Sequence, residues 1–275
     1  MKKHASTIIL AAVFVIGLSL LLYPTLSEYW NSSRQSRAIA NYAQTVEELG
    51  TEELTTMREE AQRYNANLLK KKNRWHYSDA EHAEYMSLLN PSGSGVIGYV
   101  LIPKVNVSLP IYHTTEDSVL QKAVGHFEGS SLPVGGEGTH AVLSGHRGLP
   151  SAVLFSDLDQ MEIGDLFQIK TLDAVLTYEV ENVLITDPDD VKSLEIETAE
   201  DLCTLVTCTP YGVNTHRLLI RGHRIEMEDE IEFVISGDAI KVDAQLVAPL
   251  VAAPILVALL VVLLVRSGRK KKKKE

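Results

Sequence analysis

Two long stretches without a charged residue constrain this chain of 275 residues most strongly, because each is about as long as a helix that crosses a bilayer. Residues 5–23 follow two lysines, and residues 246–265 precede a run of arginine and lysine. Basic residues flank the cytoplasmic ends of membrane helices, so both termini are expected in the cytoplasm and the region between them outside the cell. A cleaved signal peptide is the alternative for the first stretch, but no small-residue cleavage site follows it closely.

These boundaries predict a two-pass membrane protein in which the extracellular part has two regions. The expected segments are an N-terminal transmembrane signal-anchor at 1–25, an extracellular helical region at 26–95, a β-rich domain at 96–235, a linker at 236–245, a C-terminal transmembrane helix at 246–265 and a basic cytoplasmic tail at 266–275.

The charge of the extracellular part excludes one class of partner. Between the two basic tails, 17 Lys and Arg residues stand against 35 Asp and Glu residues, which leaves a net charge near −18. A domain this acidic is not expected to bind nucleic acid. It would attract a basic partner surface such as one presenting lysines, although solubility outside the cell explains the same charge.

The region before residue 95 has a helical pattern. Apolar residues recur at intervals of three and four from Ile39 to Leu49 and again from Leu54 to Leu68. Gly50 is expected to cap the end of the first helix, and Thr51 to begin the second. This predicts a helical hairpin whose apolar stripe packs on the outside of the next domain. Residues 70–95 then run from basic to aromatic residues and end in a loop-like stretch at 90–95.

The pattern changes to short strands from residue 96. Residues 98–103 and 107–112 are predicted strands, and an alternation of apolar and polar residues over 176–181 predicts a half-buried one. Short strands separated by Gly and Pro turns indicate a closed β-barrel. The fold class is therefore mainly β, with helices at its N-terminal side.

Residues 200–224 carry the strongest chemical signal. Cys208 ends a β-branched, apolar run, and Arg217 opens a second strand after a turn-rich loop. Upstream, glycines flank His146 in Ser-Gly-His-Arg-Gly. A thiol, an imidazole and a guanidinium supply the nucleophile, proton carrier and charge stabiliser that acyl transfer from an amide requires. Strand alternation puts Arg217 and Arg221 on one face and does not choose between them.

The spacing of the two cysteines argues against both a disulfide and a metal site. Cys203 and Cys208 are five residues apart in one predicted strand, so their side chains point to opposite faces and a disulfide would require the strand to break. Cys203 is predicted to be a buried apolar side chain and Cys208 a free thiol. The Cys and His spacing fits no usual zinc site, and neither a metal nor another cofactor is expected.

The run TLVTCTPYGVNTHRLLIRG resembles the active-site segment of sortases, the cysteine transpeptidases of Gram-positive surfaces, and in particular their class C, pilus-assembling branch. LSGHRGLP, HFEGSSLPVGGEGTH and GYVLIPKVNVSLPIYH are further similar stretches, in the order of the family over about residues 95–224. The resemblance implies an eight-stranded sortase-type barrel with Cys208 as nucleophile, His146 as proton carrier and Arg217 as stabiliser. His140 is the alternative base.

The resemblance also implies the substrates. They would be LPxTG-type sorting signals on pilin subunits, cleaved through a Cys208 thioester and transferred to a lysine amine of another pilin. A housekeeping sortase that anchors proteins to peptidoglycan is the nearer alternative. A cell-wall-anchored surface protein is the non-enzyme alternative, but no LPxTG-like element precedes the last apolar stretch.

Class C sortases resemble one another in an Asp-Pro-aromatic lid over the cysteine, and here this sequence departs from them. No Asp-Pro-aromatic tripeptide occurs in residues 60–95, and the nearest equivalent by position is Asn73-Arg74-Trp75. Neither Asn nor Arg can form the carboxylate ion pair with Arg217. The sequence therefore predicts a lid formed by Arg74 and Trp75 that is weakly held, so that Trp75→Ala should barely change hydrolysis of a short peptide.

Overall fold

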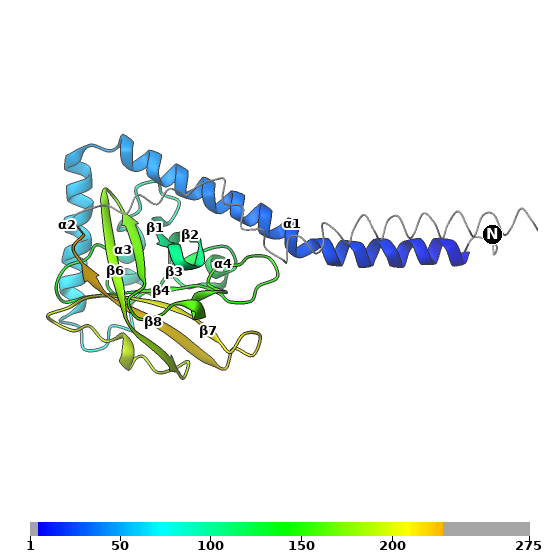
Figure 1. Cartoon of the computed structure of the whole chain (residues 1–275). Helices are drawn as coiled ribbons and strands as arrows, with labels where there is room; N and C mark the ends of the chain where they lie inside the picture. The colour runs from blue at the N-terminus through cyan, green and yellow to red at the C-terminus, as the bar shows by residue number, and fades with distance from the viewer. Residues whose placement is uncertain (1–4, 228–275) are drawn as a thin grey trace, which may run out of the picture. The chain divides into compact units, whose positions relative to one another are not determined.

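The computed structural model describes residues 5–227 and divides the chain into two compact units, of which residues 31–233 contain the β-rich domain. The predicted second membrane segment, with its linker and basic tail, lies outside the described residues. The helices are α1 (Ala5–Glu48), α2 (Thr51–Leu68), α3 (Asp79–Ser87) and the single turn α4 (Asp117–Leu120) (Figure 1). The strands are β1 (Val96–Ile102), β2 (Val107–His113), β3 (Val124–His126), β4 (Thr139–Ser144), β5 (Leu166–Thr171), β6 (Ala174–Thr186), β7 (Asp201–Thr209) and β8 (His216–Ile225).

The eight strands close into a barrel in the order β1-β2-β3-β4-β7-β8-β6-β5, which confirms the predicted fold class. Most neighbours are antiparallel, but β2 pairs with β3 and β4 with β7 in parallel. Closure leaves no strand of the barrel with an unpaired edge. The parallel β4–β7 pair brings the chain beyond Ser144 to the same end of the barrel as the last residues of β7.

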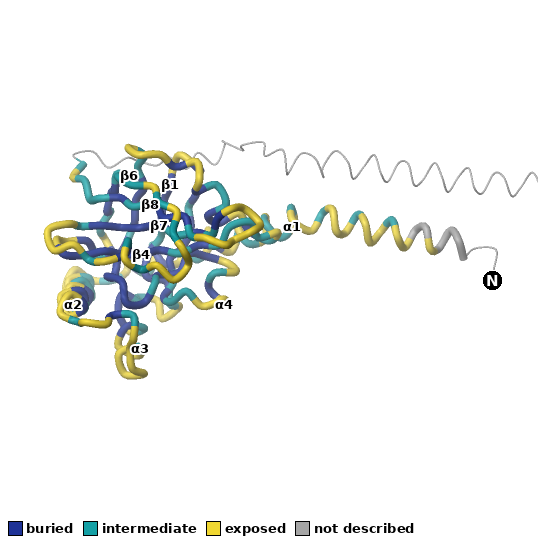
Figure 2. The backbone as a smooth tube through the Cα atoms, turned by 90° about the horizontal axis from the view of Figure 1, so that it is seen from below, coloured by how far each residue is buried: buried dark blue, intermediate teal, exposed yellow. Residues whose placement is uncertain are grey.

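The side chains of β7 alternate between the barrel interior and its outer face, as the sequence predicts. Cys203 and Leu205 are fully buried in the main apolar core, and Cys203 is a free thiol there. Val206 and Cys208 are on the other face, where both are partly exposed. Figure 2 shows buried backbone running through the barrel strands, with exposed positions gathered in the loops and on the outward side of α2.

The N-terminal helices of the β-rich unit pack on the barrel through the predicted stripes. Tyr42, at the C-terminal end of α1, is buried and donates a hydrogen bond to the Ile97 carbonyl at 3.1 Å, while its hydroxyl accepts one from the Leu172 amide at 2.7 Å. From α2, the buried Asn65 side chain bonds both the amide and the carbonyl of Leu132. These bonds satisfy backbone groups that helix packing would otherwise bury without partners.

Two details of the helical region differ from expectation. Figure 1 shows α1 and α2 meeting at a corner, so they do not form an antiparallel hairpin. Gly50 precedes the first turn of α2 with φ of −74°, and its amide donates to the Glu53 carboxylate at 3.0 Å. It is thus the N-terminal cap of the second helix, and the left-handed conformation of a C-terminal cap glycine is not used.

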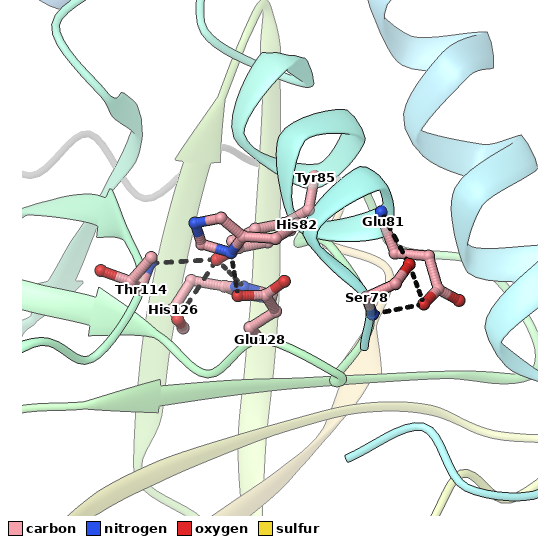
Figure 3. Close-up of polar contacts among 7 residues, drawn as sticks. All are labelled: Ser78, Glu81, His82, Tyr85, Thr114, His126 and Glu128. Atoms are coloured by element: carbon pink, nitrogen blue, oxygen red, sulfur yellow. Dashed lines mark hydrogen bonds and ion pairs between the residues drawn. The ribbon is translucent and has the colours of Figure 1, made fainter. Parts of the chain in front are cut away.

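Helix α3 lies in the predicted helical region, beyond the two helices that the apolar spacing marks. Its first turn is capped by Ser78, whose amide and hydroxyl both donate to the Glu81 carboxylate while Ser78 Oγ accepts from the Glu81 amide (Figure 3). This reciprocal arrangement satisfies two backbone donors that the start of a helix leaves free. The Ser-x-x-Glu spacing was present in the sequence and is the signal that could have predicted the helix.

The first apolar segment is helical, as predicted. By length and composition, Ala12–Glu48 of α1 qualifies as a membrane-spanning helix, the one such helix in the described part of the chain. The helix runs without interruption through Pro24, so the structure shows no break at the predicted boundary between residues 25 and 26.

Candidate active site

Cys208 and Arg217 lie directly opposite each other on neighbouring strands. The β7–β8 register pairs Cys208 with Arg217, and both side chains are on the outer face of the barrel. The residues on either side of Cys208, Thr207 and Thr209, are buried, which holds the strand in place up to the thiol. The six residues after Thr209 form the loop that joins the two strands, so the pair lies at one rim of the barrel.

His146 reaches the same rim from β4. The last pair in the parallel β4–β7 register is Ser144 with Val206, and continuing it by two residues places His146 beside Cys208. The ladder does extend past β4, since the Gly145 amide donates to the Val206 carbonyl at 3.0 Å. The Thr207 hydroxyl donates to the Gly145 carbonyl at 2.8 Å. Both bonds fix the backbone immediately before the histidine.

The arginine that strand parity left undecided is distinguished by its contacts. Arg221 Nε lies 2.6 Å from a Glu181 oxygen, and its Nη1 donates to Glu197 at 3.0 Å. Arg217 forms no ion pair within residues 5–227, and its one hydrogen bond there goes to the neighbouring His216 carbonyl at 3.2 Å. Arg217 therefore has donors available for a ligand beside Cys208, whereas Arg221 is occupied.

The alternative base, His140, is buried beneath the connection between β6 and β7. It is fully buried, with Nδ1 2.8 Å from the Glu195 carbonyl and Nε2 2.8 Å from the Thr204 hydroxyl. His146 is partly exposed, and its Nε2 lies 3.9 Å from an oxygen of the solvent-exposed Asp117. An exposed contact of this length contributes little energy, so His146 remains available to a substrate.

Three other histidines of the chain are buried and have a lowered pKa. Burial, the largest cause, lowers the pKa of each to about 4, so these rings are neutral at pH 7. They are His113, His126 and His140.

Arg147, next to His146, is a structural charge. Only 7% of its side chain is exposed, and it forms an ion pair with Asp159. Its guanidinium also lies 5.5 Å from the ring centroid of Tyr211 in the β7–β8 loop. Arg147 thereby connects the loop that carries His146 to the loop that follows Cys208.

An apolar patch on the outer face, here called the outer cluster, adjoins the Cys208–Arg217 pair. Its members all flank the strands β4, β6, β7 and β8 or pack onto them. They are Val142, Leu194 and Leu219, with the partly buried Trp75, Phe127, Leu184, Val191 and Val206. Val206 and Leu219 are paired in the β7–β8 register, two residues from Cys208 and Arg217 on the same face.

Trp75, proposed from the sequence as part of a lid, lies in the outer cluster. Its ring packs edge-on against Phe127, with 5.3 Å between ring centroids. Gly129 makes this approach possible: with φ of +92°, a side chain there would collide with the Arg74 carbonyl and come within 3.0 Å of the Trp75 ring. Trp75 therefore belongs to the same apolar patch as Val206 of β7.

Arg74 holds this segment by contacts that the sequence did not predict. Its guanidinium is 6% exposed, and Nη2 donates to the Leu194 carbonyl at 2.6 Å and lies 3.5 Å from Glu195. The same group stacks 4.3 Å from the Trp75 ring centroid. Burial lowers the pKa of Arg74, an effect that Glu195 opposes. Arg74 thus holds the segment that carries Trp75 to the β6–β7 connection.

No group of three or more His, Cys, Asp or Glu side chains within residues 5–227 is arranged to hold a metal ion. What the described site offers is a nucleophilic thiol, an imidazole and an unpaired guanidinium at one rim, beside an apolar surface. This set suits covalent transfer of an acyl group from a peptide.

Comparison with known proteins agrees with this chemistry. The family model described as the Sortase domain matches residues 100–225. Sortase D of Bacillus subtilis is 30% identical over 151 residues, which cover 54% of this chain and 73% of that protein. The chain belongs to the sortase family, whose members are cysteine transpeptidases.

Solved structures narrow the family assignment to class C. Sortase C1 of Streptococcus agalactiae is 46% identical, with a TM-score of 0.67 over 70% of this chain and all of that one. Sortase C of Streptococcus pneumoniae, whose crystal structure addresses catalysis and pilin substrate specificity, is 40% identical, with a TM-score of 0.62 over 71% of this chain and all of that one. Both of these structural neighbours are class C sortases, as the sequence motifs of this chain indicated.

Proposed function

We propose that this protein is a membrane-anchored pilus sortase that cleaves LPxTG-type sorting signals and joins the released acyl group to a lysine of another pilin. The observation that carries the proposal is the register that places Cys208 opposite Arg217, with His146 on the extension of the adjacent strand. Similarity to the pneumococcal sortase C, a protein studied for its pilin specificity, supports the choice of substrate.

In the proposed first step, Cys208 attacks the carbonyl carbon of the scissile amide. The C–N bond breaks as the C–S bond of a thioester forms, and the thiol proton passes through His146 to the leaving amine. Arg217 donates hydrogen bonds to the carbonyl oxygen as negative charge develops on it. In the second step His146 takes a proton from the incoming lysine amine, which attacks the thioester, forms an isopeptide bond and regenerates the thiol.

The proposed location follows from α1 and from the sequence beyond the described residues. The apolar N-terminal half of α1 would anchor the protein, and residues 246–265 would form a second span. Both termini would then be cytoplasmic and the barrel extracellular, where sorting signals are presented.

The test is mass spectrometry of the full-length protein in detergent with an LPxTG peptide and a pilin domain that contains candidate lysines. We expect a thioester on Cys208, followed by an isopeptide to lysine. Cys208→Ala should abolish both products, whereas the matched variant Cys203→Ala, which removes the buried thiol of the same strand, should retain them. An acyl-enzyme resolved only by water or a glycine amine would favour the housekeeping alternative, and the absence of any adduct would refute the proposal.

Arg217→Lys and Arg221→Lys form a second matched pair. We expect a loss of turnover in the first, because a lysine cannot reproduce the planar donors of a guanidinium. The second should act mainly on stability, since Arg221 is engaged with two carboxylates. Equal turnover losses in the two variants would contradict the role proposed for Arg217.

A further inference from the structure

A pocket of about 290 Å³ opens between Trp75 and the N-terminal end of α4. Aromatic rings line one part of it, and two carboxylates with two threonines line another. The residues used below are Trp75, Tyr77, Phe127, Thr114, Glu116 and Glu128. No lysine or arginine lines this pocket, and His82 is its one basic side chain. The walls therefore combine apolar surface with two carboxylates and one histidine.

Glu128 is the most informative residue of the pocket. It is 8% exposed, and Oε2 lies 2.8 Å from His82 Nδ1 beneath α3 (Figure 3). Its second oxygen, Oε1, is buried and has no hydrogen-bond partner within the described part of the chain. A buried carboxylate oxygen without a donor costs free energy, which a ligand that supplies a donor would recover.

Neighbouring groups respond to this negative charge. Burial raises the pKa of Tyr77, and the negative charges of Glu128 and Glu116 raise that pKa further. The phenol and the two carboxylates line the same pocket.

The adjacent pocket provides a contrast, because Glu128 and Tyr77 also line it. That cavity, of about 350 Å³, contains Lys70, Lys71 and Arg74 as well as acidic residues, so its charges are matched internally. One of its lysines, Lys71, is already bonded to Glu81 at 2.7 Å. On the side of Trp75 and Glu116 no lysine or arginine lines the pocket, and His82, bonded to Glu128, is the one basic side chain there.

We propose that the pocket between Trp75 and Glu116 binds a lysine side chain of the acceptor pilin, with its ammonium at Glu128 and Glu116 and its alkyl stem against the aromatic rings. An ammonium group has three donors, and carboxylates, hydroxyls and aromatic faces are its usual partners. The pocket recognises this lysine and does not activate it, because an amine held by two carboxylates stays protonated and is not a nucleophile. The reacting lysine is therefore a different one of the same acceptor.

The position of the pocket suits binding of an acceptor lysine, an inference that rests on the proposed function. Trp75, Phe127 and Val191 belong both to the pocket and to the outer cluster. Val206 of the same cluster is two residues from Cys208 along β7, a distance of about 7 Å in an extended strand. A subunit that inserts one lysine here is held on the face of the barrel that carries the thioester.

Binding is tested first with small probes on full-length Cys208→Ala protein in detergent, so that no turnover is required. Nα-acetyl-lysinamide is compared with Nα-acetyl-norleucinamide, which has nearly the same shape without the charge. The chain has two tryptophans, so NMR of the two indole N–H groups reports on Trp75 and uses Trp30 as an internal reference. We expect lysinamide, and not norleucinamide, to shift the Trp75 signal.

Substitutions identify the carboxylates. Glu128→Gln and Glu116→Gln should each weaken lysinamide binding at least fivefold, and the control Glu84→Gln, on the exposed side of α3 in the adjacent pocket, should not. Glu116 is exposed and its variant should fold even if Glu128→Gln does not. Equal binding of norleucinamide, tighter binding of Nα-acetyl-argininamide, or unchanged binding in Glu116→Gln would overturn the assignment.

Turnover separates this inference from the proposed function. In protein with an intact Cys208, Glu116→Gln should leave the rate of acyl-enzyme formation from an LPxTG peptide unchanged and raise the KM for the acceptor pilin. Transfer to pilin lysine with an unaltered KM would overturn the pocket and leave the pilus sortase intact. Lysinamide binding without any transfer to lysine would support the pocket and refute the proposed function.

Discussion

The attachment of the lid segment can be tested by replacing Arg74 with methionine, which keeps the unbranched stem and removes the guanidinium. The variant loses a charged hydrogen bond to the Leu194 carbonyl, worth about 1.5–3 kcal/mol, and a stacking contact on Trp75 worth roughly 0.5–1 kcal/mol. It also removes a cost, because Arg74 Nη1 is buried without a partner, at about 1–3 kcal/mol. The middle of each range gives a net loss of about 1 kcal/mol, or roughly a fivefold change in an equilibrium.

If this segment covers Cys208, the open state should become about fivefold more populated. The assay is the rate at which iodoacetamide, a small neutral reagent, alkylates Cys208 in the full-length protein. Cys203 is fully buried and provides a slow internal reference. Arg63→Met, in which an exposed arginine of α2 loses its loose contact with Glu60, is the charge-matched control and should leave the rate unchanged.

Two outcomes would refute the reasoning. If Trp75→Ala accelerates alkylation and Arg74→Met does not, the guanidinium does not hold the segment. If neither variant changes the rate, residues 74 and 75 do not cover the thiol at all. Two controls distinguish local opening from loss of the whole fold. Denaturant unfolding reports the global stability of each variant, and alkylation of Cys203 would rise only if the whole fold were lost.

Three further outcomes can be measured. Gly129→Ala, forced to φ of +92° and against the Arg74 carbonyl, should destabilise the protein by about 1–3 kcal/mol in denaturant unfolding and accelerate alkylation of the active-site thiol. Gly145→Ala would place a methyl 2.6 Å from the Phe155 ring. We expect a larger relative loss of peptide hydrolysis than of thermal stability. The three buried histidines have pKa values of about 4 in the folded protein against an ordinary value of 6.5. Their contribution to the free energy of unfolding should therefore be complete above pH 6.5 and be lost as pH drops towards 4, by up to about 1.4 kcal/mol per histidine per pH unit. A flat pH profile would contradict this.

The active-site placement of Cys208 and Arg217 could be predicted because it depends on neighbouring strands. A cysteine at a strand end, a short loop and an arginine at the next strand start specify a register that the structure confirms. The apolar stripes of α1 and α2 were predictable for the same reason, since a local period determines which face is buried.

Other features depend on contacts between residues far apart in sequence, and no local pattern reports them. Arg74 bonds a carbonyl 120 residues away, and Arg221 is excluded from the site by Glu181 and Glu197. Helix α3 is a different case, because its Ser-x-x-Glu cap is a local signal that predicts a helix start, although basic and aromatic residues surround it. The corner between α1 and α2 follows from where the barrel accepts each stripe, which periodicity alone does not specify.

The bond from Arg74 to Leu194 joins two segments that would otherwise move separately. Leu194 belongs to the connection between β6 and β7, and Arg74 to the strap that precedes α3. A peptide that displaces either segment from the outer cluster must break the same interaction, so each displacement lowers the cost of the other. A ligand that displaces only the β6–β7 connection therefore also loosens the guanidinium that stacks on Trp75.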